Sequence, residues 1–342
     1  MEIALKSPTL SLVVPVHNEV GAVGLFLARA APVLRGLGKT FTYEIVFVDD
    51  GSTDATLAEL LAARAENPRI RIVALSRNFG KDTALAAGLA HASGQAVIPI
   101  DVDLQDPPEV IPQLLAKWRE GFDVVNARRA DRSSDSWMKR ATARSFYRVF
   151  NQMADRPILE DVGDFRLLSR RVVDVVNQFP ERARFMKGLF SWVGFRQATI
   201  DYQRGARAAG ETKWRYWRLW NFAVDGITSF TTVPLRIWTY FGATIAVLAF
   251  VFAAVLIART ILFGIDTPGY ASLMVVVLFF GGVNLLSLGV IGEYLGRTYT
   301  EVKGRPLYII DRTWGFEGPL SGVLARAPKV SRARKSPAAR AR

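Results

Sequence analysis

Short apolar runs, each followed by a cluster of polar residues, recur through the first 130 residues of the chain. Their length and branched side chains are typical of buried strands. Strands are predicted over 10–16, 44–48, 70–75, 96–100 and 123–126. The stretches between the first four have helical periodicity, with helices ending near residues 34, 65 and 92. Strands that alternate with helices favour right-handed βαβ connections, so we predict an α/β fold with a mainly parallel sheet.

Two long apolar segments follow in the second half of the chain. Residues 237–258 and 271–291 contain no charged residue, and each is long enough as a helix to span a bilayer core of about 30 Å. Their short connection contains Pro268 and Gly269, which predicts a hairpin. Basic residues dominate before the first segment and after the second, which places both ends in the cytoplasm. A hairpin buried in a soluble core is the alternative, although two such segments rarely occur there.

Composition excludes several kinds of site. The 342-residue chain has no cysteine, which rules out disulfides, thiolate nucleophiles and cysteine-based zinc sites. Its two histidines, His17 and His91, would have to converge from distant segments to form a metal site. The first residues lack the basic and apolar regions of a signal peptide, so no cleavage is expected.

The charge of the chain is concentrated at one end. The formal net charge is +13, and seven basic residues with no acidic one lie in the tail 326–342. Alanine, proline and serine separate these residues, so we expect a disordered tail that is attracted to anionic lipid. Nucleic-acid binding is disfavoured because no aromatic residue is interleaved and no recognition motif precedes the tail.

An acidic segment follows the fourth predicted strand. Asp101, Asp103 and Asp106 lie in the sequence DVDLQD, together with Gln105. Crowded carboxylates need a counter-charge, and Mg²⁺ or Mn²⁺ prefers oxygen ligands and can bridge to a diphosphate. The alternative interpretation is a turn in which Asp106 caps the helix that begins near Pro107.

Polar residues follow the other predicted strands as well. Because the carboxyl ends of parallel strands share one edge of a sheet, we expect these side chains to meet in a ligand site. They are Asn18, Glu19, Asp49, Asp50, Arg77, Lys81, Asp101 and Asp103. Asn18 is also a candidate N-cap for the first helix. A dinucleotide-binding fold is disfavoured, since no G-x-G-x-x-G follows the first strand.

Four motifs in a fixed order carry a family resemblance. PVHNE at 15–19, VDDGSTD at 48–54, SRNFGK at 76–81 and DVDLQDPPE at 101–109 resemble glycosyltransferase family 2, whose members have a Rossmann-like GT-A fold. The resemblance covers about residues 9–312. It is strongest to the polyisoprenyl-phosphate hexosyltransferases, which include bactoprenol glucosyltransferases and dolichol-phosphate mannose synthases.

This resemblance implies a nucleotide-sugar site that uses Mg²⁺ or Mn²⁺. Asp101 and Asp103 are implied to face the diphosphate and, with Gln105, to bind the metal; Asp103 is also a catalytic candidate. His17 differs from the Tyr of some relatives. The residues implied to bind the nucleotide are Pro15, His17, Glu19, Asp49 and Asp50.

Further site residues are implied later in the chain. Arg128 corresponds to a family arginine that contacts a phosphate of donor or acceptor. Arg207 and Lys213 belong to a loop that resembles the family's R-x-x-G-E-S-K, for which a solvated basic loop is the alternative. Asp161 and Asp164, expected between two helices, resemble a segment that closes over the sugar, and we favour Asp164 over Asp161 as a base.

Pattern and resemblance together predict five segments. These are a cytoplasmic GT-A catalytic domain (1–212), an interfacial amphipathic segment (213–236), a transmembrane hairpin (237–292), a cytoplasmic C-terminal segment (293–325) and the basic tail (326–342). The expected location is the inner (plasma) membrane, as a multi-pass protein with the catalytic domain and both termini in the cytoplasm. A homo-oligomer, a tetramer in bacterial relatives, is implied, whereas no nucleic-acid partner is expected.

The favoured function is an inverting transfer of a hexose, glucose by resemblance, from a UDP-sugar to undecaprenyl phosphate. Relatives with these motifs also transfer mannose or aminosugars, so another nucleotide sugar is an alternative donor. A processive polysaccharide synthase is disfavoured because no Q-x-x-R-W motif occurs and one hairpin cannot enclose a glycan. A non-catalytic membrane scaffold or flippase partner is disfavoured by the intact acidic pair and basic loop.

Overall fold

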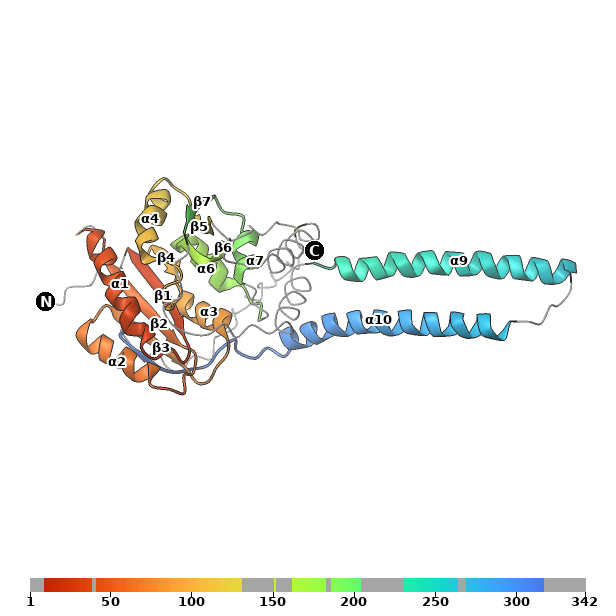
Figure 1. Cartoon of the computed structure of the whole chain (residues 1–342), viewed down its shortest axis with the longest axis horizontal. Coiled ribbons are helices and arrows are strands. Elements are labelled where there is room, and N and C mark those ends of the chain that lie inside the picture. Colours follow the sequence, from red (N-terminus) through yellow and green to blue (C-terminus); the bar gives the residue numbers. More distant parts are fainter. Residues whose placement is uncertain are drawn as a thin grey trace, which may run out of the picture. The chain divides into compact units, whose positions relative to one another are not determined.

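A computed structural model describes residues 9–38, 41–130, 151, 162–182, 186–203, 231–263 and 269–316. The chain divides into two compact units, which we call the sheet unit and the helical unit (Figure 1). The sheet unit takes in Met1–Asp135, Leu159–Thr212 and Pro306–Arg342, and the helical unit takes in Ser136–Ile158 and Lys213–Arg305. The chain therefore leaves the sheet unit for the helical unit and later returns to it.

The sheet unit contains one eight-stranded sheet in the order β7-β5-β6-β4-β1-β2-β3-β8. Its strands are β1 (Leu10–Val16), β2 (Tyr43–Asp49), β3 (Ile70–Leu75), β4 (Ala96–Pro99), β5 (Val124–Arg129), β6 (Val162–Ser169), β7 (Gln197–Tyr202) and β8 (Ile310–Trp314). Its helices are α1 (Ala22–Gly36), α2 (Thr56–Glu66), α3 (Lys81–His91), η1 (Pro108–Val110), α4 (Ile111–Arg119), α6 (Arg170–Gln178) and α7 (Met186–Trp192).

Four adjacent strands of this sheet are parallel, in the order β3-β2-β1-β4. Their residues are almost all buried, as expected for strands covered on both faces. The prediction of an α/β fold with a mainly parallel sheet is confirmed. In this order the chain reverses direction across the sheet between β1 and β4, and open α/β sheets bind ligands at the carboxyl ends of such neighbouring strands.

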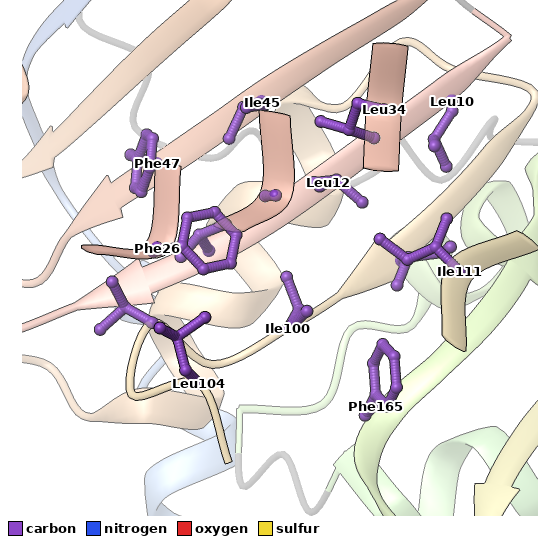
Figure 2. Close-up of a cluster of buried hydrophobic side chains, with 14 of the residues drawn as sticks. Leu10, Leu12, Phe26, Leu34, Ile45, Phe47, Ile100, Leu104, Ile111 and Phe165 are labelled. Atoms are coloured by element: carbon purple, nitrogen blue, oxygen red, sulfur yellow. The ribbon is translucent and has the colours of Figure 1, made fainter. Parts of the chain in front are cut away.

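Helices cover both faces of the sheet. On one face Phe26 of α1, Leu60 of α2 and Ile111 of α4 belong to the same hydrophobic cluster as alternate residues of β1 such as Leu12. Figure 2 shows Phe26, Ile111 and Leu12 of this cluster. Ala84 and Ala87 of α3 belong to a second cluster on the other face. Phe26 and Phe47 meet edge to face, with ring centroids 6.0 Å apart. This packing fixes the strand ends from which the polar residues project.

Three strands differ from what the sequence predicts. The segment 161–166 was expected between two helices and no strand was predicted in it; from Val162 onward it forms β6, which pairs antiparallel with both β4 and β5 and is followed by α6. Neither β7 nor β8 was predicted; β8 follows the helical unit in the chain and pairs antiparallel with β3. Charged and small residues interrupt all three sequences, so none shows the apolar run of the earlier strands.

The helical unit contains two long helices, α9 (Val233–Phe263) and α10 (Tyr270–Val302), which run antiparallel side by side (Figure 1). The two expected spans lie within them. Their segments Leu235–Phe252 and Val275–Val302 are apolar and long enough to cross a membrane. The Tyr294 hydroxyl donates to the Thr231 carbonyl at 2.7 Å, which ties α10 to the residues just before α9.

Gly88 allows α3 to lie against the sheet, and its replacement tests this packing. A Cβ at Gly88 would lie 2.2 Å from Val13 Cγ1 and 3.0 Å from Val48 Cγ2. We predict that Gly88→Ala lowers the free energy of unfolding by about 1–3 kcal/mol, because overpacking outweighs the higher helix propensity of alanine. Thermal unfolding of the full chain in detergent measures the loss.

The matched control is Gly36→Ala in α1, where an added Cβ meets nothing within 4 Å. This variant should unfold at or slightly above the wild-type temperature, since alanine is the better helix former. Equal melting temperatures for the two variants would show that α3 does not depend on close contact at Gly88.

Candidate active site

Strand direction brings the candidate residues to one edge of the sheet. Residues after β1, β2, β3 and β4 share the carboxyl edge of the parallel strands. Because β6 is antiparallel to β4, the first residues of β6 lie at that same edge. Asp164, two residues into β6, is therefore placed close to Asp101, which follows β4.

The acidic segment after β4 alternates between buried and half-buried residues. Val102 and Leu104 are buried, whereas Asp101, Asp103 and Gln105 keep partial exposure. Leu104 has a φ of 58°, a left-handed conformation that costs an ordinary residue roughly 1–2 kcal/mol. Its side chain belongs to the core cluster that includes Phe26 and Ile100, as Figure 2 shows. Burial of Leu104 thus stabilises a turn that presents the polar residues on its other side.

Asp106 does not cap the following helix. No side-chain hydrogen bond caps η1 or α4, and Asp106 is buried and accepts a hydrogen bond from the Tyr202 hydroxyl of β7. The interpretation of Asp106 as a helix cap is therefore wrong. Burial, together with the adjacent Asp106 carboxylate, raises the pKa of the Tyr202 hydroxyl well above its usual range. This hydrogen bond joins the end of the acidic segment to β7.

Lys81 connects Asp101 with Asp164. The Lys81 ammonium lies 2.7 Å from Oδ1 of Asp101 and 2.8 Å from its Oδ2, and 3.0 Å from Oδ2 of Asp164. Burial opposes the charged form, but attraction by the two carboxylates outweighs it and raises the pKa of Lys81 far above its ordinary value. A candidate metal ligand and the favoured base are therefore held together by one cation.

The loops after β1, β2 and β3 are tied together through Asp50. Its carboxylate accepts hydrogen bonds from the backbone N–H of Phe79 at 2.7 Å and of Gly80 at 2.9 Å. Burial raises the pKa of the Asp50 carboxyl, while these two donors oppose the rise. His17 Nδ1 lies 2.9 Å from the Asp50 carbonyl oxygen, so this nitrogen is the protonated one.

Asn18 joins the same loops and is not the N-cap of α1. The cap position is Gly21, and Asn18 instead adopts a left-handed backbone with a φ of 55°. Its side-chain oxygen accepts the Thr53 N–H at 2.8 Å, an arrangement for which asparagine is suited by its short amide. Gly51 is required nearby, because a Cβ there would lie 2.3 Å from the Arg77 carbonyl carbon.

The remaining candidates are placed as follows. Pro15 is in β1, Glu19 lies in the loop before α1, and Asp49 ends β2, where it accepts the Ser52 N–H at 3.2 Å. Arg128, near the end of β5, donates to both carboxylate oxygens of Asp201 at 2.7 and 3.0 Å. Asp161, Arg207 and Lys213 lie outside the described residues.

The donor set at the acidic segment fits a hard divalent cation. Among the described residues no group of three or more His, Cys, Asp or Glu side chains is arranged to hold a metal. Asp101 and Asp103 supply carboxylate oxygens, and Gln105 could add an amide oxygen, because its Oε1 is buried without a hydrogen-bond donor. Mg²⁺ and Mn²⁺ accept carboxylate and amide oxygens, so the residues present suit either ion.

Two contributors to this arrangement were not assigned by sequence reasoning. Lys81 was grouped with the polar strand-end residues but given no role, and its position directly after the SRNFG turn was the available signal. Tyr202 had no usable signal, because β7 itself was not predicted.

Removal of the Tyr202 hydroxyl tests how far it supports the acidic segment. Tyr202→Phe deletes one hydrogen bond to the buried Asp106 carboxylate, which should lower the free energy of unfolding by about 1–3 kcal/mol. Tyr43→Phe is the control, because the Tyr43 hydroxyl accepts only a longer, exposed contact from Arg69 at 3.3 Å in the described structure. Melting temperatures that are lowered equally in the two variants would contradict the prediction.

Comparison with known proteins identifies the family. Residues 11–176 match the family described as glycosyl transferase family 2. A protein of Synechocystis sp. described as an uncharacterized glycosyltransferase is 54% identical over 308 residues, covering 90% of this chain and 96% of that protein. The prophage bactoprenol glucosyl transferase homolog of Escherichia coli K12 is 51% identical over 303 residues, with 89% and 98% covered. The bactoprenol glucosyl transferase of Shigella phage SfII is 51% identical over 304 residues, with 89% and 98% covered. The chain belongs to glycosyl transferase family 2, as its four ordered motifs predicted.

Proposed function

We propose that this glycosyltransferase transfers a hexose, glucose in the first instance, from a UDP-sugar to undecaprenyl or another polyprenyl phosphate. Relatives that match 89% of the chain are described as a bactoprenol glucosyl transferase and as a homolog of one. The observation that carries the proposal is the meeting of Asp101 and Asp164 at Lys81, on the ligand-binding edge of the sheet. Lys81 thus links Asp101, in the segment proposed to face the diphosphate, to Asp164 of β6, the residue we favour as the base.

On the donor side, the proposal assigns nucleotide binding to the tied loops after β1 and β2. Their members are Pro15, His17, Glu19, Asp49 and Asp50. Asp101, Asp103 and Gln105 would hold Mg²⁺ or Mn²⁺, which when bound offsets the negative charge that develops on the departing nucleoside diphosphate. Leu104 burial and the Tyr202–Asp106 hydrogen bond keep this segment oriented before the donor arrives.

On the acceptor side, inversion requires a single displacement. An oxygen of the lipid phosphate bonds to the anomeric carbon as the bond from that carbon to the UDP oxygen breaks, and UDP leaves with the electron pair. A phosphate monoester is already largely anionic at neutral pH, so positioning matters more than proton removal. We favour Asp164 as the base, with Asp161 and Asp103 as further catalytic candidates. Arg128, Arg207 and Lys213 are proposed to bind phosphate.

The helical unit supports a membrane location. α9 extends over 31 residues, about 46 Å as a helix, which exceeds the bilayer core of about 30 Å. We infer a multi-pass protein of the plasma (inner) membrane with the catalytic domain, residues 1–212, and both termini in the cytoplasm. The same inference treats 213–236 as interfacial, 237–292 as the hairpin, 293–325 as cytoplasmic and 326–342 as a lipid-attracted tail, and proposes a homo-oligomer.

Transfer of radiolabel tests the proposed reaction directly. Membranes or purified full chain incubated with labelled UDP-glucose and undecaprenyl phosphate should yield an organic-extractable glycolipid. Long polymer would instead indicate a processive synthase, and no product with any of a panel of nucleotide sugars would indicate a non-catalytic scaffold. Mannose or aminosugar transfer would keep the reaction type and change the donor.

Replacement of Asp103 tests the acidic segment. Asp103→Asn keeps the shape of the side chain and removes a charge, so we predict a rate at least about 100-fold lower with an unchanged melting temperature. Asp174→Asn, on the exposed side of α6 in an ion pair with Arg170, is the matched control and should keep the wild-type rate. Full activity of Asp103→Asn would remove the metal assignment.

The two candidate bases are separated by parallel substitution. Because Asp164 contacts Lys81 at the sheet edge, Asp164→Asn should lower turnover by at least about tenfold and more than Asp161→Asn does. Single-turnover rates with saturating donor provide the comparison. Near-wild-type rates for both variants would exclude both carboxylates.

A further inference from the structure

The Lys81 ammonium occupies the oxygens that a metal would need. Both carboxylate oxygens of Asp101 lie within 2.8 Å of Nζ, and a third contact at 3.0 Å reaches Oδ2 of Asp164. An ammonium group has three donors, so these contacts can use its full hydrogen-bonding capacity. In this arrangement both carboxylate oxygens of Asp101 contact the Lys81 ammonium.

A lysine and a divalent ion cannot share Asp101 at such short range without strong repulsion. Two like charges a few ångströms apart repel each other strongly even at the effective dielectric of about 20 near a protein surface. Removal of the ammonium with nothing in its place would take from Asp101 and Asp164 the cation that both carboxylates contact. Asp101 therefore holds either the ammonium or a divalent ion, and not both at the same time.

We propose that Lys81 is the internal counter-cation of the metal-free site and competes with the divalent ion for Asp101. On metal binding, Lys81 gives up Asp101 and keeps Asp164. This inference rests on the proposed function, because it assumes that Asp101 is a metal ligand. Its consequence is a site that stays folded without metal, at the expense of some metal affinity.

The position of Lys81 allows such an exchange. It is the first residue of α3, directly after Gly80, and its side chain is 47% exposed, so the side chain that has to move is not enclosed by packing. The side chain of Asp164 is only 17% exposed and holds the other contact. The compact, strongly hydrated ammonium of lysine on a flexible stem suits a cation that moves.

Binding of Mn²⁺ to the nucleotide-free full chain tests the competition. We expect Lys81→Met to bind Mn²⁺ at least about tenfold more tightly than wild type by electron paramagnetic resonance, and to melt at a lower temperature without metal. Lys81→Arg keeps the charge and should stay near the wild-type affinity. Lys117→Met removes a similarly exposed lysine of α4, which pairs with Glu120 just after the helix, and it should change neither Mn²⁺ affinity nor melting temperature.

A measurement on the wild-type protein gives an answer even where Lys81→Met does not fold. Lys81 should react faster with an amine-labelling reagent when Mn²⁺ is saturating, because one of its two carboxylates has been taken. Lys117 is the internal control and should label at a constant rate. Mass spectrometry of the labelled peptides separates the two residues.

The outcomes distinguish the inference from the proposed function. Unchanged or weaker Mn²⁺ binding by Lys81→Met, or unchanged labelling of Lys81, overturns the proposed competition. Glycolipid synthesis by the wild type would then still support the proposed function. Failure of the wild type to bind Mn²⁺ overturns the metal assignment and the inference with it. Tighter binding together with faster labelling supports the exchange.

Discussion

Carboxylates that converge on one edge of a sheet repel one another, and the sheet unit is arranged around the cation that prevents this. Asp101 comes from the carboxyl end of a parallel strand, Asp164 from the start of an antiparallel one, and Lys81 from the first turn of a helix. These three elements are separated in sequence and are fixed by the packing on the two faces of the sheet. The ion pairs therefore depend on the topology of the sheet, and the chemistry of the site depends on the ion pairs.

Buried residues hold in place the polar segments at the carboxyl edge of the parallel strands. Leu104 holds a left-handed turn because its side chain is packed into the core, and the Tyr202–Asp106 hydrogen bond secures the far end of the same segment. Asp50 performs a related task for the neighbouring loops through two backbone N–H groups. Such supports let a surface segment hold several partly exposed oxygens in fixed positions.

The apolar runs of the first half of the chain were sufficient to predict its parallel strands. The predictions 10–16 and 70–75 coincide with β1 and β3, because strands buried on both faces leave an uninterrupted apolar signal. β6, β7 and β8 include charged residues that interrupt the apolar pattern, so local pattern did not reveal them. Once these strands were predicted, the polar residues that follow the first four of them could be placed at one edge of the sheet. The contact of Lys81 with Asp164 and that of Arg128 with Asp201 join residues at least 73 positions apart, and only the pairing of the strands brings them together.

The most direct test of this account is an experimental structure of the full chain with UDP and Mn²⁺ bound. The account predicts that Mn²⁺ contacts oxygens of Asp101 and Asp103 and the diphosphate, and that Lys81 has left Asp101 while it still contacts Asp164. A diphosphate bound away from the carboxyl edge of β1 and β4, or a metal held elsewhere with Lys81 still on Asp101, would contradict it.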